Sequence, residues 1–203
     1  MKWTTAFQNK EVVATVVRGA DQYFSDFRKS PKLAQSDPRQ ANSDWQGLGA
    51  LGDAVRLLAE PLQPVLDGTI DDGAGKKIAR RAAWSEMLQA SRDGHRRNRR
   101  QYTNQTMIVD LNIYRANRGV AAIDSAHALP ENDARRYLYE AVGLQPWLGS
   151  DTDSGPQKPL GENFLQLTRK GLTRELDFVG YNGEVLDWVT HIYLATCERG
   201  KPA

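Results

Sequence analysis

Side chains that can bind or neutralise an anion are concentrated between Arg96 and Gly119. The stretch opens with arginines at 96, 97, 99 and 100, continues as Tyr102-Thr103-Asn104-Gln105, and becomes an apolar segment with further amides. Arginine can bind a carboxylate through two parallel hydrogen bonds, and amide side chains donate to carboxylates or sugar hydroxyls. These residue types predict a surface that recognises an acidic, hydroxyl-bearing ligand.

A helix predicted over 98–116 would hold the polar side chains of this stretch near one face. The members of that face are Gln101, Gln105, Asn112 and Arg115. Asn104 lies one residue away, at the end that is predicted to enter a cleft. The other face is apolar and is predicted to pack: Met107, Leu111 and Tyr114. Alternatively, the amides form a buried network that fixes helix packing, because a buried amide without a partner is costly.

The charge of the chain is uneven. The formal net charge is only +2, yet the segment from Lys76 to Arg100 holds nine basic residues and two acidic ones. A local basic patch favours an anionic partner. The alternative is a solvated helix face that acids elsewhere in the fold balance. Nucleic acid is an unfavoured partner, since no helix-turn-helix pattern of the right short spacing is present.

Composition predicts one soluble globular domain over residues 1–203, with 40% hydrophobic and 26% charged residues. Cys197 is the single cysteine, which excludes an internal disulfide framework and a cysteine-based metal site. The three histidines are far apart in sequence, so we predict no metal and no other cofactor. No apolar run of membrane-spanning length occurs, so we expect no membrane partner. The N-terminus lacks the apolar core of a signal peptide, and the chain is expected to be one piece of a larger protein.

Apolar periodicity predicts a succession of helices separated by loops. The predicted helices cover 10–27, about 52–66, 74–91, 98–116, about 131–142 and 183–197, and the longer loops cover 28–44 and 143–161. No clear run of strands is present. We therefore predict an all-α fold in which helical hairpins form a ring or partial ring and present side chains at one open end.

Glycine and proline mark the predicted limits of these helices. Pro61 and Pro64 are expected to bend or break the second helix, and Gly94 to end the third. Gly119 is expected to end the fourth helix as a C-terminal glycine. The glycines of the 47–52 segment would allow close approach between helices or a flexible entry into the second helix.

Aromatic side chains could add sugar-binding surfaces, because flat apolar rings suit the apolar faces of sugar rings. Trp147 and Tyr181 stand beside glycines in predicted loops and are the better ligand candidates. Trp84 and Trp188 are instead predicted to pack in the core.

Three features together resemble the α/α-toroid domain of polysaccharide lyases, in the heparinase II/III-like and chondroitin/alginate lyase group. They are the helix entry Tyr102-Thr103-Asn104-Gln105, the turn Gly180-Tyr181-Asn182-Gly183-Glu184 before a helix, and the string of helical hairpins. The resemblance implies an incomplete α/α toroid, a secreted or periplasmic location and an anionic polysaccharide or oligosaccharide as partner. It also implies cleavage of a uronic-acid polysaccharide by β-elimination, in which carboxylate neutralisation acidifies the adjacent C5 proton.

The resemblance implies a role for each site residue. Asn104 and Gln105 would neutralise the uronate carboxylate, and Tyr102 or Tyr181 would transfer the proton, with His95 as an alternative base. The implied substrate-binding residues are Arg99, Arg100, Arg115, Asn112, Trp147 and Glu184.

Two other functions remain open. A glycoside hydrolase on the same scaffold could pair the carboxyl groups of Asp110 and Glu184 as acid and base. Asp110 stands in an apolar stretch, where burial would raise its pKa. The third possibility is a non-catalytic helical module that binds an anionic partner through its basic segment.

Overall fold

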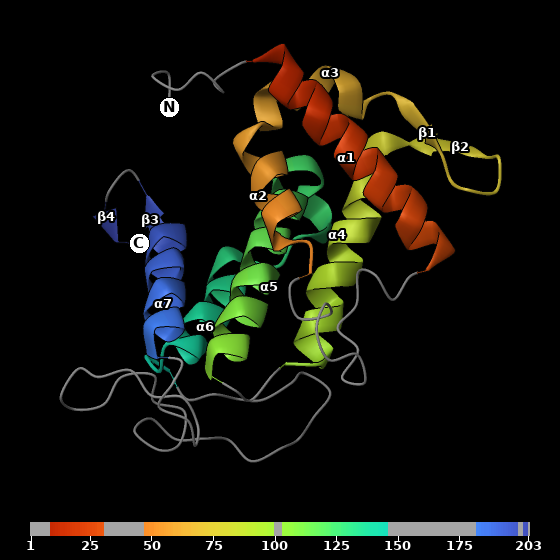
Figure 1. Ribbon diagram of the computed structural model, residues 1–203. Coiled ribbons are helices and arrows are strands. Elements are labelled where there is room, and N and C mark those ends of the chain that lie inside the picture. The colour runs from red at the N-terminus through yellow and green to blue at the C-terminus, as the bar shows by residue number, and fades with distance from the viewer. Residues whose placement is uncertain (1–8, 31–46, 100–102, 146–181, 199–200, 203) are drawn as a thin grey trace.

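Helix α5 (Thr103–Ile123) runs through the middle of the molecule. The computed structural model describes residues 9–30, 47–99, 103–145, 182–198 and 201–202. Four helices contact α5 (Figure 1): α2 (Gly49–Leu57), α4 (Arg80–Arg97), α6 (Glu131–Ala141) and α7 (Asn182–Thr196). This helical architecture confirms the all-α prediction.

Helix α1 (Lys10–Lys29) lies across α2, α4 and the short helix α3 (Ala59–Leu66). Its start is capped by Asn9, whose side-chain oxygen accepts a hydrogen bond of 2.9 Å from the amide of Glu11. The predicted apolar face is confirmed, since Phe24 and Phe27 are buried. The predicted second helix breaks at Leu58, three residues before Pro61, and thus forms α2 and α3.

A two-stranded antiparallel hairpin replaces the first residues of the predicted third helix. Strand β1 (Thr69–Asp71) pairs with β2 (Lys77–Ala79). In the turn, side-chain oxygens of Asp71 and Asp72 accept backbone N–H bonds, which stabilises a non-helical conformation. Gly73 and Gly75 there have φ values of 85° and 82°, which favour glycine. The helix prediction for 74–79 is therefore wrong.

Two predicted helix ends are also wrong. Helix α4 continues through Gly94 to Arg97, and α5 continues through Gly119 to Ile123. Gly119 is used for close packing, because a Cβ atom added to it would lie 2.6 Å from the Cα of Gly52 in α2. The predicted close approach through the glycines of the 47–52 segment is confirmed at this crossing.

Apolar side chains form two main clusters on either side of α5. The first is formed by side chains of α1, α2, α3 and α4 and of the end of α5. It includes Trp84, which is fully buried as predicted. The second joins α5, α6 and α7 and contains the predicted apolar face of α5: Met107, Leu111 and Tyr114. Trp188 packs against this second cluster while remaining partly exposed.

Three short elements complete the described residues: the 3₁₀ helix η2 (Ser125–His127) and the paired strands β3 (Cys197–Glu198) and β4 (Lys201–Pro202). Among the helices described, none combines the length and the apolar character needed to cross a bilayer.

Candidate functional site

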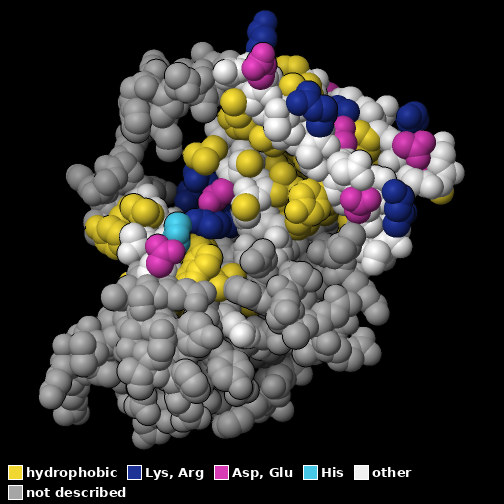
Figure 2. Space-filling model, in the orientation of Figure 1, with side chains coloured by type: hydrophobic (Ala, Val, Ile, Leu, Met, Phe, Trp, Pro, Cys, Tyr) yellow, Lys and Arg dark blue, Asp and Glu magenta, His cyan; other side chains and the backbone are white. Residues whose placement is uncertain are grey.

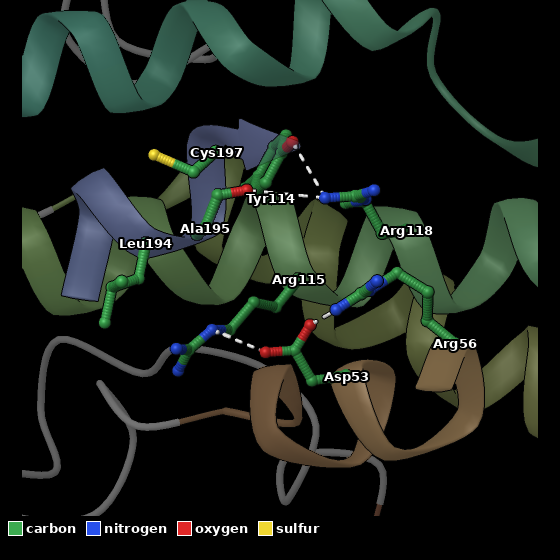
Figure 3. A pocket seen from close by; sticks show the side chains of 8 residues that line it. All are labelled: Asp53, Arg56, Tyr114, Arg115, Arg118, Leu194, Ala195 and Cys197. Atoms are coloured by element: carbon green, nitrogen blue, oxygen red, sulfur yellow. Dashed lines mark hydrogen bonds and ion pairs between the residues drawn. The ribbon is translucent and has the colours of Figure 1, made fainter. Parts of the chain in front are cut away.

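A polar pocket of about 430 Å³ lies where α2, α5 and the end of α7 meet. Figure 2 shows basic and acidic side chains at the bottom of a hollow beside α7. Eight residues line the pocket (Figure 3): Asp53, Arg56, Tyr114, Arg115, Arg118, Leu194, Ala195 and Cys197. Its volume is within the range of small-ligand sites in proteins.

One carboxylate in the pocket is shared by two arginines. Asp53 Oδ1 is 3.4 Å from Nε of Arg56, and Asp53 Oδ2 is 2.8 Å from Nε of Arg115. The two arginines reach Asp53 from opposite sides (Figure 3). The Nε of Arg115 is buried and makes no well-aligned hydrogen bond, although it is close to Asp53. Each of these side chains is between 23% and 32% exposed, so a ligand can reach them.

The third arginine of the pocket, Arg118, joins α5 to the end of α7. Its Nη1 donates to the carbonyl oxygen of Ala195 and to the hydroxyl of Tyr114, both at 3.3 Å. Its guanidinium carbon lies 5.5 Å from the centre of the Tyr114 ring, a distance that allows a cation–π contact. These contacts hold the cation at the pocket wall. Among the described residues no carboxylate forms an ion pair with Arg118, although Glu131, which accepts the Tyr114 hydrogen bond, attracts it electrostatically.

The hydroxyl of Tyr114 cannot act as a base near neutral pH. Its hydroxyl donates a 2.7 Å hydrogen bond to Glu131. Burial, together with this bond, raises the pKa of Tyr114 to about 12. The hydroxyl therefore stays protonated near neutral pH.

The lining residues give the pocket a positive surplus. It has three guanidinium groups and one carboxylate, so two positive charges remain unbalanced among the side chains that line it. Leu194 adds an exposed apolar surface at the edge. This combination suits a ligand with more than one negative charge, held by bidentate hydrogen bonds.

Arg99 occupies a different environment from the one predicted. Its side chain is fully buried and donates to both carboxylate oxygens of Asp110 and to one of Glu140. The bond between Arg99 Nε and Asp110 Oδ1 is 2.9 Å. The predicted substrate contact of Arg99 is corrected to a structural role, because its charge is neutralised inside the fold and is not accessible to a substrate.

Asp110 is equally buried, and this decides the role of its carboxyl group. Burial raises the pKa of Asp110 to about 6, although Arg99 opposes the rise. The predicted rise is thus confirmed. Because its side chain has no exposed surface, Asp110 cannot touch a sugar in the position expected of a hydrolase acid.

His95 and Asn112 are also placed inside the fold. His95 has no exposed surface, and its Nδ1 lies 3.1 Å from the carbonyl oxygen of Ser91, so its predicted role as a base in contact with substrate is corrected. Asn112 is 8% exposed, and its Oδ1 accepts a 3.1 Å hydrogen bond from the amide of Gly49 at the start of α2. The alternative prediction, a buried amide that fixes helix packing, is correct for Asn112.

The basic segment 76–100 is largely balanced within the fold. Arg80 pairs with Asp21 at 3.0 Å, and Arg81 pairs with Asp67 at the same distance. Asp93 pairs with Arg92 at 2.8 Å and with Arg96 at 3.0 Å, and the buried Arg92 also donates to Asn117. For these arginines the alternative prediction, balance by acids of the fold, is correct.

The other predicted site residues are divided between helices and undescribed segments. Asn104 and Gln105 lie in the first turn of α5, and Glu184 lies in the first turn of α7. Four more lie outside the described residues: Arg100, Tyr102, Trp147 and Tyr181. Of the predicted residues that the structure describes, Arg115 alone lines the pocket, ten residues, or about 15 Å, along α5 from Gln105.

Three charged pocket residues were not predicted from sequence: Asp53, Arg56 and Arg118. A local signal existed, since Asp53 with Arg56 and Arg115 with Arg118 each stand three residues apart on one helix face. Nothing in the sequence paired α2 with the second half of α5, so the two faces could not be combined into one site.

Neither a family model, nor a curated protein, nor a solved structure matches this chain.

Proposed function

We propose that this protein binds a carboxylate-bearing saccharide in the pocket between α2, α5 and α7. The observation that carries the proposal is the surplus of two positive charges among the described, partly exposed residues of the pocket lining, with Arg115 and Arg118 on one wall. Guanidinium groups recognise carboxylates through paired hydrogen bonds, and Leu194 offers an apolar surface for a sugar face. The saccharide part of the proposal also draws on the resemblance to uronate-cleaving proteins.

The test compares an acidic with a neutral ligand of the same size. Isothermal titration calorimetry with a short oligogalacturonate should give saturable binding that weakens as salt is added. Salt weakens it because the charged side chains of the pocket are partly exposed to solvent. A neutral oligosaccharide of matched length should not bind. Equal binding of both oligosaccharides would contradict recognition through the carboxylates.

Variants then locate the binding to the pocket. Arg115→Gln and Arg118→Gln should each weaken binding of the oligogalacturonate about ten-fold, the loss expected for a hydrogen bond to a charged group. Arg18→Gln is the matched control, because Arg18 is an exposed arginine of α1 outside the pocket. If the control weakens binding as much as the pocket variants, the ligand is held elsewhere.

Cleavage by β-elimination is the enzymatic extension of this proposal. It requires a base near the anionic site, and the protonated hydroxyl of Tyr114 does not supply one. The step would thus depend on Tyr102 or Tyr181 on an incomplete α/α toroid, with Asn104 and Gln105 as neutralising amides. Gln105 lies about 15 Å along α5 from Arg115, so the sugar unit that is cleaved would differ from the one held in the pocket. An unsaturated uronate product absorbs ultraviolet light, so rising absorbance with oligogalacturonate supports elimination. Saturable binding with no change in absorbance supports the non-catalytic module.

A further inference from the structure

A second hollow lies between α1 and α3, apart from the arginine pocket. It has a volume of about 610 Å³ and shares no lining residue with the pocket. We call it the α1/α3 groove. Its lining residues are Lys10, Val13, Ala14, Val17, Arg18, Pro61 and Val65.

The floor of the α1/α3 groove is apolar and open. The five lining residues of α1 follow the spacing i, i+3, i+4, i+7 and i+8, which places them on one helix face. Val13, Val17 and Val65 pack against the first apolar cluster and yet remain partly exposed. The groove is therefore a continuation of the core that reaches the surface.

The ends of the groove are positively charged. Lys10 and Arg18 are both exposed, and no acidic side chain is among the described residues that line the groove. Arg18 donates to the hydroxyl of Thr15 at 3.1 Å, and within the described ranges neither cation forms an ion pair. The two residues are eight positions apart, which corresponds to about 12 Å of helix, or about two turns.

We propose that the α1/α3 groove binds an amphipathic helix of a protein partner, with acidic residues about two turns apart beside its apolar stripe. Such a helix fills an apolar groove of this kind and can pair with both cations at once. A fatty acid has a single carboxylate and would leave one cation unpaired. An anionic membrane surface is disfavoured because α1 carries three acidic residues beside its four basic ones: Glu11, Asp21 and Asp26.

The test uses two fluorescently labelled helical peptides of about 16 residues, long enough to cover the groove. Both carry the same leucine stripe, and they differ only at two positions two turns apart, which are Glu in one peptide and Lys in the other. Fluorescence anisotropy with the full chain should show tighter binding of the Glu peptide, by about two- to five-fold for each charge pair.

Charge reversal provides the decisive variant. The double change Lys10→Glu with Arg18→Glu should invert the preference, so that the Lys peptide binds more tightly. Val17→Asp should weaken both peptides ten-fold or more, because it places a charge on the apolar floor. Arg115→Gln should leave both affinities unchanged. Circular dichroism melting checks that each variant folds. Positions 10 and 18 are exposed, so charge reversal there leaves the packing of the core unchanged.

Three results would overturn the proposal. The first is that the wild-type chain binds neither peptide. The second is that the charge-reversed chain keeps the wild-type preference. The third is displacement of the bound Glu peptide by decanoate at similar molar concentration, which would identify the groove as an acyl-chain site.

Discussion

Two groups of arginines on α5 and its neighbours meet carboxylates in opposite ways. In the buried cluster, Arg99 faces Asp110 and Glu140, and all three side chains are fully enclosed. In the pocket, Arg56 and Arg115 share Asp53, and these side chains are a quarter to a third exposed. The residue types are the same, so the difference comes from the ratio of charges and from burial.

This difference separates a structural role from a binding role. Removing charges from water costs several kcal/mol per ion, which a protein tolerates only where partners are complete. In the buried cluster the charges balance, since Arg136 Nε lies 3.0 Å from the second carboxylate oxygen of Glu140 and makes two cations for two anions. This last ion pair is not aligned as a hydrogen bond, and the Arg136 side chain is 39% exposed. The pocket keeps more cations than anions because water, or a ligand, can reach them.

The largest expected effect comes from breaking the buried cluster. Arg99→Met keeps much of the side-chain volume but removes the guanidinium group. Both carboxylate oxygens of Asp110 and one of Glu140 then lose the hydrogen bonds that Arg99 donates. We expect the free energy of unfolding to fall by about 3–5 kcal/mol, as for other buried pairs that lose one member. Urea denaturation followed by circular dichroism measures the change.

Arg56→Met is the matched control for this variant. It removes an arginine from the exposed pair with Asp53, which should cost less than about 1 kcal/mol. A similar loss for both variants would mean that burial does not distinguish the two groups.

The next effect concerns the pH dependence of the buried cluster. The folded-state pKa of Asp110 is about 6, against an ordinary value of 3.8, so its stabilising contribution is complete below 3.8 and is lost as pH rises through 6. Over this window the contribution falls by about 3 kcal/mol. Asp110→Asn removes the titration, so the stability of wild type relative to this variant should decrease between these pH values.

Urea denaturation of both proteins at several pH values measures that difference, and the other carboxylates cancel in it. A wild-type advantage that grows with pH would show that attraction to Arg99 outweighs burial at Asp110.

The sequence predicted helices well where apolar periodicity was long. The helix over 10–27, the apolar face of α5 and the burial of Trp84 all followed from spacing. The turn at Asp71, Asp72 and Gly73 is indicated by the sequence, but the two strands beside it were missed, because each is only three residues long.

The site was predicted less well, for a tertiary reason. An arginine of the stretch predicted as an amide-rich helix has the same sequence signature whether it meets buried acids, as Arg99 does, or a pocket, as Arg115 does. In the structure Arg99 lies in the connection before α5, which begins at Thr103 and not at the predicted residue 98. The acids that decide between these outcomes come from other elements: Glu140 from α6 and Asp53 from α2. Their positions depend on how α2 and α6 pack against α5.

The smallest expected effect tests that packing directly. Gly119→Ala adds a Cβ atom that would lie 2.6 Å from Gly52 Cα and 2.9 Å from Gly52 O, so α2 must move away from α5. We expect a loss of about 1–3 kcal/mol in the free energy of unfolding, the usual cost of overpacking, and a weaker ligand affinity because Asp53 and Arg56 move with α2.

Gly19→Ala is the control, since Gly19 lies within helix α1 and an added Cβ would have no neighbour within 4 Å. Alanine there should stabilise the chain by about 0.5–1 kcal/mol and leave ligand binding unchanged, because only the helix propensity improves. If Gly119→Ala lowers stability while leaving affinity intact, the pocket does not depend on the α2–α5 crossing. If it lowers both, the same close contact that packs the core also sets the distance between the two walls of arginines.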